Sequence, residues 1–318
     1  LPDMKIEALA EDQNGGIWVG THDCGVARFD GTDFRQFDRS DGLSGEGVYR
    51  IAEDALGNLI FATNRGLTVY DGRIFTSIEA SSSYGFLWGC CRDNTGALLF
   101  GLERRPGKPM AIFRWTGQDG YLIEFPSQIK AVGESVNGLA LDDDGELWLS
   151  ADTLYHAEGA EIRSVPEVKS PRGIIGPEDG EMLVGGASGV WSATTSSARL
   201  VFATKGSGAN LILGNGRHHW IGSWDGKLHS REGEKTRLIR DFGRPAQALL
   251  QSENGCLWVG IYGLGLFKYD APVWNTYEAL DSRHAIRPSC LSLQGDRLWV
   301  GSSMGGQVPF SVETHRLA

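Results

Sequence analysis

Residues that could recognise a ligand recur at intervals of about forty along the chain. Each follows a short polar segment, and together they include carboxylates, guanidinium groups, amides and large aromatic rings. At equivalent positions the sequence has Glu7, Tyr49, Trp88, Asn137, Arg172, Ala209, Gln247 and Arg287. Aromatic faces for stacking, combined with groups that orient a ligand by hydrogen bonds, are typical of a pocket for a polar, ring-containing molecule. Solvated strand ends would also carry such residues, so the pocket is a hypothesis.

The segments near these positions differ in sequence from one interval to the next and add further polar and aromatic groups. They contain His22, Asp23, Arg65, Arg104, Arg105, Trp224, Asp225 and Tyr262. An arginine can bind a carboxylate through two parallel hydrogen bonds, which beside aromatic rings favours carboxylated sugars. We therefore expect a small-molecule or oligosaccharide ligand, although any one of these charges could simply be solvated.

Familiar catalytic and metal-binding motifs are missing. The sequence has no Gly-x-Ser-x-Gly elbow, no His-Glu-x-x-His pair, no phosphate-binding glycine loop and no EF-hand. We therefore expect no cofactor and no metal. His22 and His284 are the histidines placed where a general base could act. His218 and His219 are adjacent on a predicted strand and should point to opposite faces.

An internal repeat must position these residues. The segment "EDQNGGIWVGT" (residues 11–21) returns as "SENGCLWVG" (252–260), and six further copies are legible. Successive copies are 35 to 49 residues apart, measured between Trp18, Ile60, Leu99, Trp148, Leu183, Trp220, Trp258 and Trp299. The repeat fills the chain without a linker, which predicts a single domain over residues 1–318.

Each repeat has the alternating pattern of short strands rather than the pattern of a helix. Asn14-Gly15 and Asp30-Gly31 are typical hairpin turns, so one unit should form four antiparallel strands. Eight such meanders that stack face to face form an all-β β-propeller of eight blades, with seven as the alternative. The hairpin turns disfavour a parallel β-helix. The repeated tryptophans should fill the space between neighbouring blades.

The first repeat resembles a known family. The pattern "I..LAED..G.IWVGT..GV.RFDG..F..F...DGL", legible over residues 6–43, is similar to the two-component regulator propeller repeat of bacterial hybrid signalling proteins. The resemblance implies seven blades and a ligand-sensing role, with a signalling output domain outside this chain as a partner. It also favours a periplasmic or other extracytoplasmic location, although no secretion signal is legible and the compartment stays open.

Composition narrows the functional classes. A formal net charge of −10 argues against nucleic acid as a partner. No apolar run approaches the roughly 18 residues that a membrane helix requires. We favour a non-catalytic sensing or binding module for a polar, carbohydrate-like ligand. The alternatives are a propeller lyase, acting on uronate-containing glycans or a cyclic depsipeptide, and a protein–protein interaction scaffold.

Overall fold

The protein is described from a computed structural model. It covers residues 5–82, 84, 87–102, 111–125, 136–159, 161–178, 180–215, 218–252, 255–262, 264–277, 288–294, 297–302 and 311–313. The described elements are antiparallel strands and two single-turn 3-10 helices, Arg39–Asp41 and Glu79–Ser81. No helix among these residues is long and apolar enough to cross a membrane. Contacts divide the chain into two compact units, Leu1–Ile78 with Ala246–Ala318, and Glu79–Pro245.

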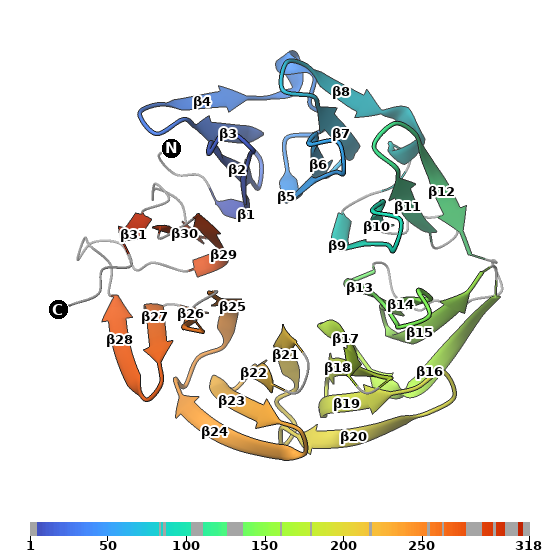
Figure 1. Cartoon of the computed structure of the whole chain (residues 1–318), viewed down its shortest axis with the longest axis vertical. Coiled ribbons are helices and arrows are strands. Elements are labelled where there is room, and N and C mark those ends of the chain that lie inside the picture. Colours follow the sequence, from blue (N-terminus) through green and yellow to red (C-terminus); the bar gives the residue numbers. More distant parts are fainter. Residues whose placement is uncertain are drawn as a thin grey trace. The chain divides into compact units, whose positions relative to one another are not determined.

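The first unit contains four of the meanders drawn in Figure 1. Its strands are β1 (Ile6–Glu11), β2 (Ile17–Thr21), β3 (Val26–Phe29), β4 (Phe34–Phe37), β5 (Val48–Glu53), β6 (Leu59–Thr63), β7 (Gly66–Tyr70), β8 (Phe75–Ile78), β25 (Ala246–Gln251), β26 (Leu257–Ile261), β27 (Gly265–Asp270), β28 (Val273–Tyr277), β29 (Pro288–Gln294), β30 (Arg297–Ser302) and β31 (Ser311–Glu313). The first strands of the four sheets are neighbours, in the order β25, β29, β1 and β5.

The second unit also contains four meanders. Its strands are β9 (Leu87–Arg92), β10 (Leu98–Leu102), β11 (Ala111–Trp115), β12 (Gly120–Glu124), β13 (Gly138–Leu141), β14 (Leu147–Ser150), β15 (Thr153–Glu158), β16 (Glu161–Lys169), β17 (Ile174–Glu178), β18 (Glu181–Gly186), β19 (Gly189–Ala193), β20 (Ala198–Ala203), β21 (Ala209–Asn215), β22 (His218–Ser223), β23 (Lys227–Glu232) and β24 (Lys235–Asp241). Here β9, β13, β17 and β21 are successive neighbours.

The all-β propeller architecture with four-stranded antiparallel blades is confirmed, but the prediction of eight such blades is wrong. Seven sheets have four strands, which is the number given as the alternative. The remaining sheet, β29 to β31, has three strands in the part of the chain that the structure describes. The repeat was counted on the second strand, which every sheet has, whereas a complete blade also needs an outer fourth strand. That outer strand carries no strong repeated motif.

An aspartate at the first hairpin turn of the first four repeats explains why the turn sequence recurs there. The Oδ1 atom of Asp12 accepts hydrogen bonds from the backbone N–H groups of Asn14 and Gly16, each at 2.9 Å. Its Oδ2 atom accepts the indole N–H of Trp18 at 2.8 Å. One carboxylate therefore closes the hairpin and holds the tryptophan in place. The backbone part of this arrangement recurs at Asp54, Asp93 and Asp142.

Tryptophans fill the space between neighbouring sheets, as predicted. Trp18 is fully buried, and its ring centroid lies 5.2 Å from that of Phe61 and 5.1 Å from that of Tyr70, both in the next sheet. Trp258 is also fully buried and packs against Leu298 and Val300. These contacts bury large apolar areas that no single meander could cover alone.

Glycines on the second strand let neighbouring sheets approach closely. A Cβ atom at Gly20 would lie 2.8 Å from the carbonyl oxygen of Val48, and one at Gly260 would lie 2.6 Å from the Cβ atom of Pro288. In each case the first strand of the next sheet occupies the space that a side chain would need. The "WVG" sequence therefore encodes packing between sheets rather than a ligand site.

Replacement of Trp258 by Ala should lower the free energy of unfolding by about 3 to 5 kcal/mol, because it leaves a cavity between two sheets. Trp224 is the control, since its side chain is 50% exposed. Trp224→Ala should change the free energy by less than about 0.5 kcal/mol. Urea denaturation followed by circular dichroism measures both values. Equal losses in the two variants would contradict the assigned role of Trp258.

Acid should destabilise the fold through His219, whose neighbour His218 lies on the opposite face of β22. Burial, together with Arg231 and His218 nearby, lowers the pKa of His219 from 6.5 to about 4. Between these values the unfolded chain binds a proton that the folded chain does not, so stability falls as the pH drops from 6.5 towards 4. The loss through this group should be roughly 2 to 3 kcal/mol, from about 1.4 kcal/mol per pH unit.

Urea midpoints at pH 7 and pH 4.5 measure this loss. His219→Gln does not titrate and should reduce the loss, whereas His218→Gln should keep it. His218 is the matched control because its Nε2 atom lies 3.0 Å from the hydroxyl oxygen of Ser230, on the other face. An acid loss that is the same in His219→Gln as in the parent would rule out this origin.

Candidate functional site

Most of the residues that were aligned with Glu7 across the repeats share one structural position, a β-bulge near the start of the first strand. Strand β1 pairs Ile6 with Thr21 and Ala8 with Gly20, which leaves Glu7 as the extra residue. The same shift places an extra residue at Tyr49 in β5 and at Gln247 in β25. In β9 the shift falls at Trp88 and Gly89. A bulge redirects a side chain away from the regular strand pattern and is common beside binding sites.

Two predicted residues lie just before their strands and show the same bulge geometry, in which two consecutive residues face a single residue of the second strand. The backbone N–H of Asn137 donates to the carbonyl of Ser150 at 2.7 Å, although Gly138 is the residue paired with Ser150. The N–H of Arg172 likewise donates to the carbonyl of Gly185 at 2.8 Å, beside Gly173. Asn137 and Arg172 are therefore equivalent to Glu7.

In two repeats the residue that was predicted to be equivalent to Glu7 is not the one at the bulge. The bulge in β21 falls at Asn210 rather than at Ala209, and the bulge in β29 falls at Ser289 rather than at Arg287. Alternation of apolar and polar residues could not reveal this, because a bulge shifts the alternation by one residue. The hydroxyl of Ser289 donates to the carbonyl of Ile6 at 2.6 Å, so it links β29 to β1.

Three predicted residues, Glu7, His22 and Tyr49, come together in the first unit. The Nδ1 atom of His22 lies 3.0 Å from Oε1 of Glu7, which also contacts Nζ of Lys5 at 2.5 Å. The rings of His22 and Tyr49 meet edge to face, with centroids 5.8 Å apart. The His22 side chain is 47% exposed and that of Glu7 is 15% exposed, whereas Tyr49 is buried. We call these three residues the β1–β5 cluster.

Local structure explains why the β1–β5 cluster forms. The backbone N–H of His22 donates to the carbonyl of Lys5 at 2.9 Å, which holds the segment after β2 against the start of β1. A Cβ atom at Gly47 would lie 2.6 Å from the carbonyl of His22 and 2.8 Å from the hydroxyl of Tyr49. Only glycine at this position lets the chain entering β5 approach the His22 segment so closely. The cluster is thus held by backbone contacts.

The β1–β5 cluster can donate and accept hydrogen bonds at a partly exposed surface. The contact with Glu7 orients the His22 imidazole and leaves its Nε2 atom on the side away from the carboxylate. A carboxylate that orients an imidazole is suited to binding hydroxyl groups and, with a bound substrate in reach, to moving a proton. The buried ring of Tyr49 acts as a wall rather than as an exposed stacking face.

Two predicted acids have partners close by. Asp225 accepts a hydrogen bond from the hydroxyl of Ser223 at 2.5 Å and forms an ion pair with Lys227. Partial burial alone would raise the pKa of Asp225, but the bonds from Lys227 and Ser223 lower it to about 2. Asp23 is exposed, and its Oδ1 atom lies 3.3 Å from the thiol of Cys24. Asp225 is therefore held in local structure rather than free to meet a ligand.

The remaining predicted residues are dispersed or lie beyond the described part of the chain. Arg65 and Tyr262 are exposed in the first unit, and Arg172 and Trp224 are exposed in the second. Arg104, Arg105, Arg287 and His284 fall outside the described residues, as does the side chain of Trp88. That these residues together line one ligand-binding pocket therefore stays a prediction.

A groove of about 420 Å³ lies on the opposite side of the first unit, at the hairpin turns of β1–β2 and β5–β6. Its charged lining residues include Asp12 and Arg28, which form an ion pair at 2.7 Å. Asp12 also holds the Trp18 indole. Because these charges already stabilise the blade, we assign the groove to packing rather than to ligand binding.

Comparison with known proteins identifies the first repeat. The family model of the two component regulator propeller matches residues 1–23. No curated protein sequence matches the chain.

Solved structures share the fold at low sequence identity. The extracellular domain of a proposed one-component system from B. thetaiotaomicron is 18% identical with a TM-score of 0.60, over 95% of this chain and 38% of that one. The present chain thus spans about two fifths of that extracellular domain. A computationally designed protein, Ika8, gives a TM-score of 0.71 at 14% identity, over 96% and 95% of the two chains. A streptogramin B lyase gives 0.61 at 16% identity, over 87% and 95%.

These likenesses establish the β-propeller fold. The resemblance to the two-component regulator propeller family, inferred from residues 6–43, is confirmed by the family match to the first repeat.

Proposed function

We propose that this chain is a non-catalytic, ligand-binding sensor propeller of a bacterial signalling protein. The observation that carries the proposal is the shared position of Glu7, Tyr49 and Gln247 at the bulges of three first strands in one unit. These residues differ in chemistry, although the surrounding strands repeat. A backbone geometry that repeats within the chain, combined with side chains that vary, is what a binding surface on a rigid scaffold requires.

The ligand we propose is a polar, carbohydrate-like molecule. Glu7 supplies an acceptor, His22 a group that can donate or accept, and Gln247 an amide that can do both. Sugar hydroxyls need such mixed partners. The exposed guanidinium group of Arg65, in the same unit, supports a carboxylated sugar over a neutral one. An output domain outside this chain would convert binding into a signal.

Glu7→Gln and His22→Ala should each weaken binding of short uronate-containing oligosaccharides by about 1 to 2 kcal/mol, roughly tenfold, because each removes one polar contact. Isothermal titration calorimetry measures the affinities. Glu232→Gln is the matched control, since Glu232 is exposed at the turn between β23 and β24. Unchanged affinity in both site variants, with a ligand bound by the parent, would place the ligand elsewhere.

The second candidate is a lyase, which the contact between Glu7 and His22 favours because it could orient a general base. The likeness to a streptogramin B lyase is compatible with this reading at the level of fold. Binding and catalysis differ in what happens to the ligand.

A non-catalytic sensor should leave uronate-containing oligosaccharides intact. The ultraviolet absorbance of a new conjugated double bond reports elimination, and it should stay at the background rate during prolonged incubation. Steady turnover that is abolished in His22→Ala would establish the lyase and refute the sensor. Turnover that persists in this variant would indicate a contaminating enzyme, and a repeat with more highly purified protein would decide between them.

A further inference from the structure

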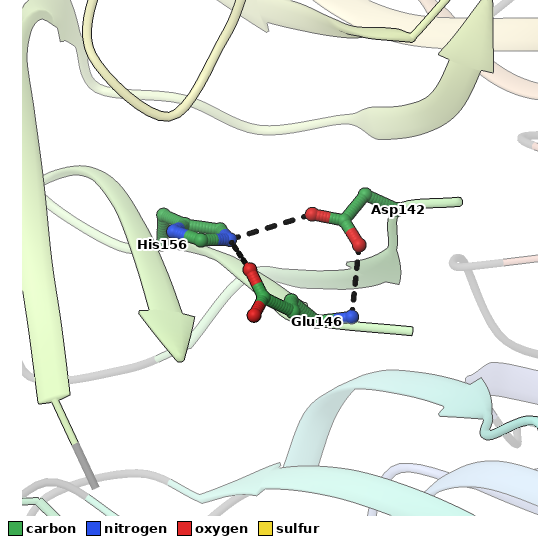
Figure 2. Close-up of side chains that lie close together, drawn as sticks. All are labelled: Asp142, Glu146 and His156. Carbon is green, nitrogen blue, oxygen red and sulfur yellow. Dashed lines mark hydrogen bonds and ion pairs between the residues drawn. The ribbon is translucent and has the colours of Figure 1, made fainter. Parts of the chain in front are cut away.

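We propose that Asp142, Glu146 and His156 form a binding site for a divalent transition-metal ion of the Zn²⁺ class. The three side chains come from the ends of β13 and β14 and from β15, all within one sheet of the second unit (Figure 2). Nothing in the proposed ligand-binding function depends on them. They lie beside the hairpin turn between β13 and β14.

The distances match those of a metal site. The Nε2 atom of His156 lies 3.0 Å from Oε2 of Glu146 and 3.3 Å from Oδ2 of Asp142. One donor atom from each residue lies within 4.8 Å of the other two. Zinc binds imidazole nitrogen and carboxylate oxygen at about 2.0 to 2.2 Å, so two ligands of a tetrahedral ion lie roughly 3.3 Å apart. Little movement is needed to hold an ion.

The imidazole of His156 is buried and lacks a well-directed hydrogen bond at Nε2. Its side chain is only 2% exposed, and its Nε2 atom points at the two carboxylates without making a hydrogen bond of acceptable geometry. The short distances to Glu146 and Asp142 are thus close contacts rather than well-directed bonds. A buried nitrogen that faces two carboxylates without a well-directed hydrogen bond to either of them is unfavourable. An ion between them would satisfy all three groups.

Comparison with other sheets of the same chain shows that this arrangement departs from the repeat. His156 is paired with Trp148, just as Arg28 is paired with Trp18 and Arg114 with Leu99. Each arginine donates through Nε to the turn aspartate, at 2.7 Å to Asp12 and at 2.8 Å to Asp93. In those sheets the guanidinium fills the position and supplies the positive charge.

The β13–β16 sheet changes two residues of this arrangement at once. His156 replaces the arginine, and Glu146 stands where the other two sheets have Gly16 and Ala97. A fixed positive charge is lost, and a second carboxylate is gained at the same place. Both changes make the position more negative, so together they convert an internal ion pair into a set of metal ligands that favours a bound cation.

The surroundings provide orientation and access. Asp142 is held by the indole N–H of Trp148 at 2.9 Å and by the backbone N–H of Glu146 at 2.8 Å. Such outer contacts orient metal ligands. The Glu146 side chain is 30% exposed and lines a cavity of about 210 Å³ between neighbouring sheets of the second unit. An ion can reach the site from there, and water can supply a fourth ligand.

The test is calorimetric titration of the full chain with Zn²⁺, after treatment with a chelator and desalting. Two variants restore the residues of the other sheets: His156→Arg, as at Arg28, and Glu146→Ala, as at Ala97. Each should weaken Zn²⁺ binding by at least about tenfold, since even the outer partners of metal ligands are worth about 10–100-fold. Because both residues already occur in folded sheets of this chain, the variants should keep the circular dichroism spectrum of the parent.

Two controls make the result specific. His22→Ala removes a histidine paired with a carboxylate in the first unit and should leave this Zn²⁺ affinity unchanged. Ca²⁺, which prefers sites of six to eight oxygen ligands, should bind far more weakly than Zn²⁺. If one variant fails to fold, the other still decides the question.

Absence of Zn²⁺ binding in the parent would overturn the proposal and leave His156 as a structural substitute for the arginine of the other sheets. Parent-like affinity in both His156→Arg and Glu146→Ala would also overturn it, because the ion would then bind elsewhere. Tighter binding of Ca²⁺ than of Zn²⁺ would refute the assigned class of ion.

Discussion

The architecture depends on the close approach of each first strand to the second strand of the preceding sheet. A side chain at Gly20 or Gly260 would occupy the space of the neighbouring strand, so the sheets could not pack at this spacing. The same spacing lets Trp18 and Trp258 reach the next sheet and bury their rings. Packing between sheets, rather than any single meander, provides the hydrophobic core.

The bulges follow from the same geometry. Two residues of the first strand oppose a single residue of the second strand, as Glu7 and Ala8 oppose Gly20. The extra residue therefore lies beside the point of closest approach, where its side chain can vary without disturbing the ladder. The propeller thus repeats its backbone while it changes the chemistry at one position in each blade. The β1–β5 cluster uses this freedom.

Departures from the repeat carry the most information about chemistry. Asp12 and Arg28 form an ion pair that stabilises a blade, and Asp93 with Arg114 repeats it. Partial burial would raise the pKa of Asp12, but hydrogen bonds from Arg28, Gly16 and Trp18 lower it overall. In the β13–β16 sheet the equivalent pair is replaced by His156 between two carboxylates. Substitutions at two positions, those of His156 and Glu146, thus distinguish the proposed metal site from the structural ion pair of the other sheets.

Much of the fold could be predicted from the sequence, because the signals were local. The Asn-Gly and Asp-Gly turns and the alternating strands identified four-stranded antiparallel meanders, which seven of the described sheets form. The tryptophan positions also indicated contacts between blades. Each of these features depends on a few neighbouring residues.

Tertiary structure alone decided the rest, because the relevant contacts join residues that are distant in sequence or shifted in register. The number of four-stranded blades depends on outer strands that carry no strong motif. The bulges at Asn210 and Ser289 arise from pairing with the second strand, so alternation placed them one or two residues too early. The grouping of Asp142 and Glu146 with His156 requires β15 to pair with β14. A sequence motif specifies spacing along one strand, whereas a site is assembled from side chains that pairing brings across strands.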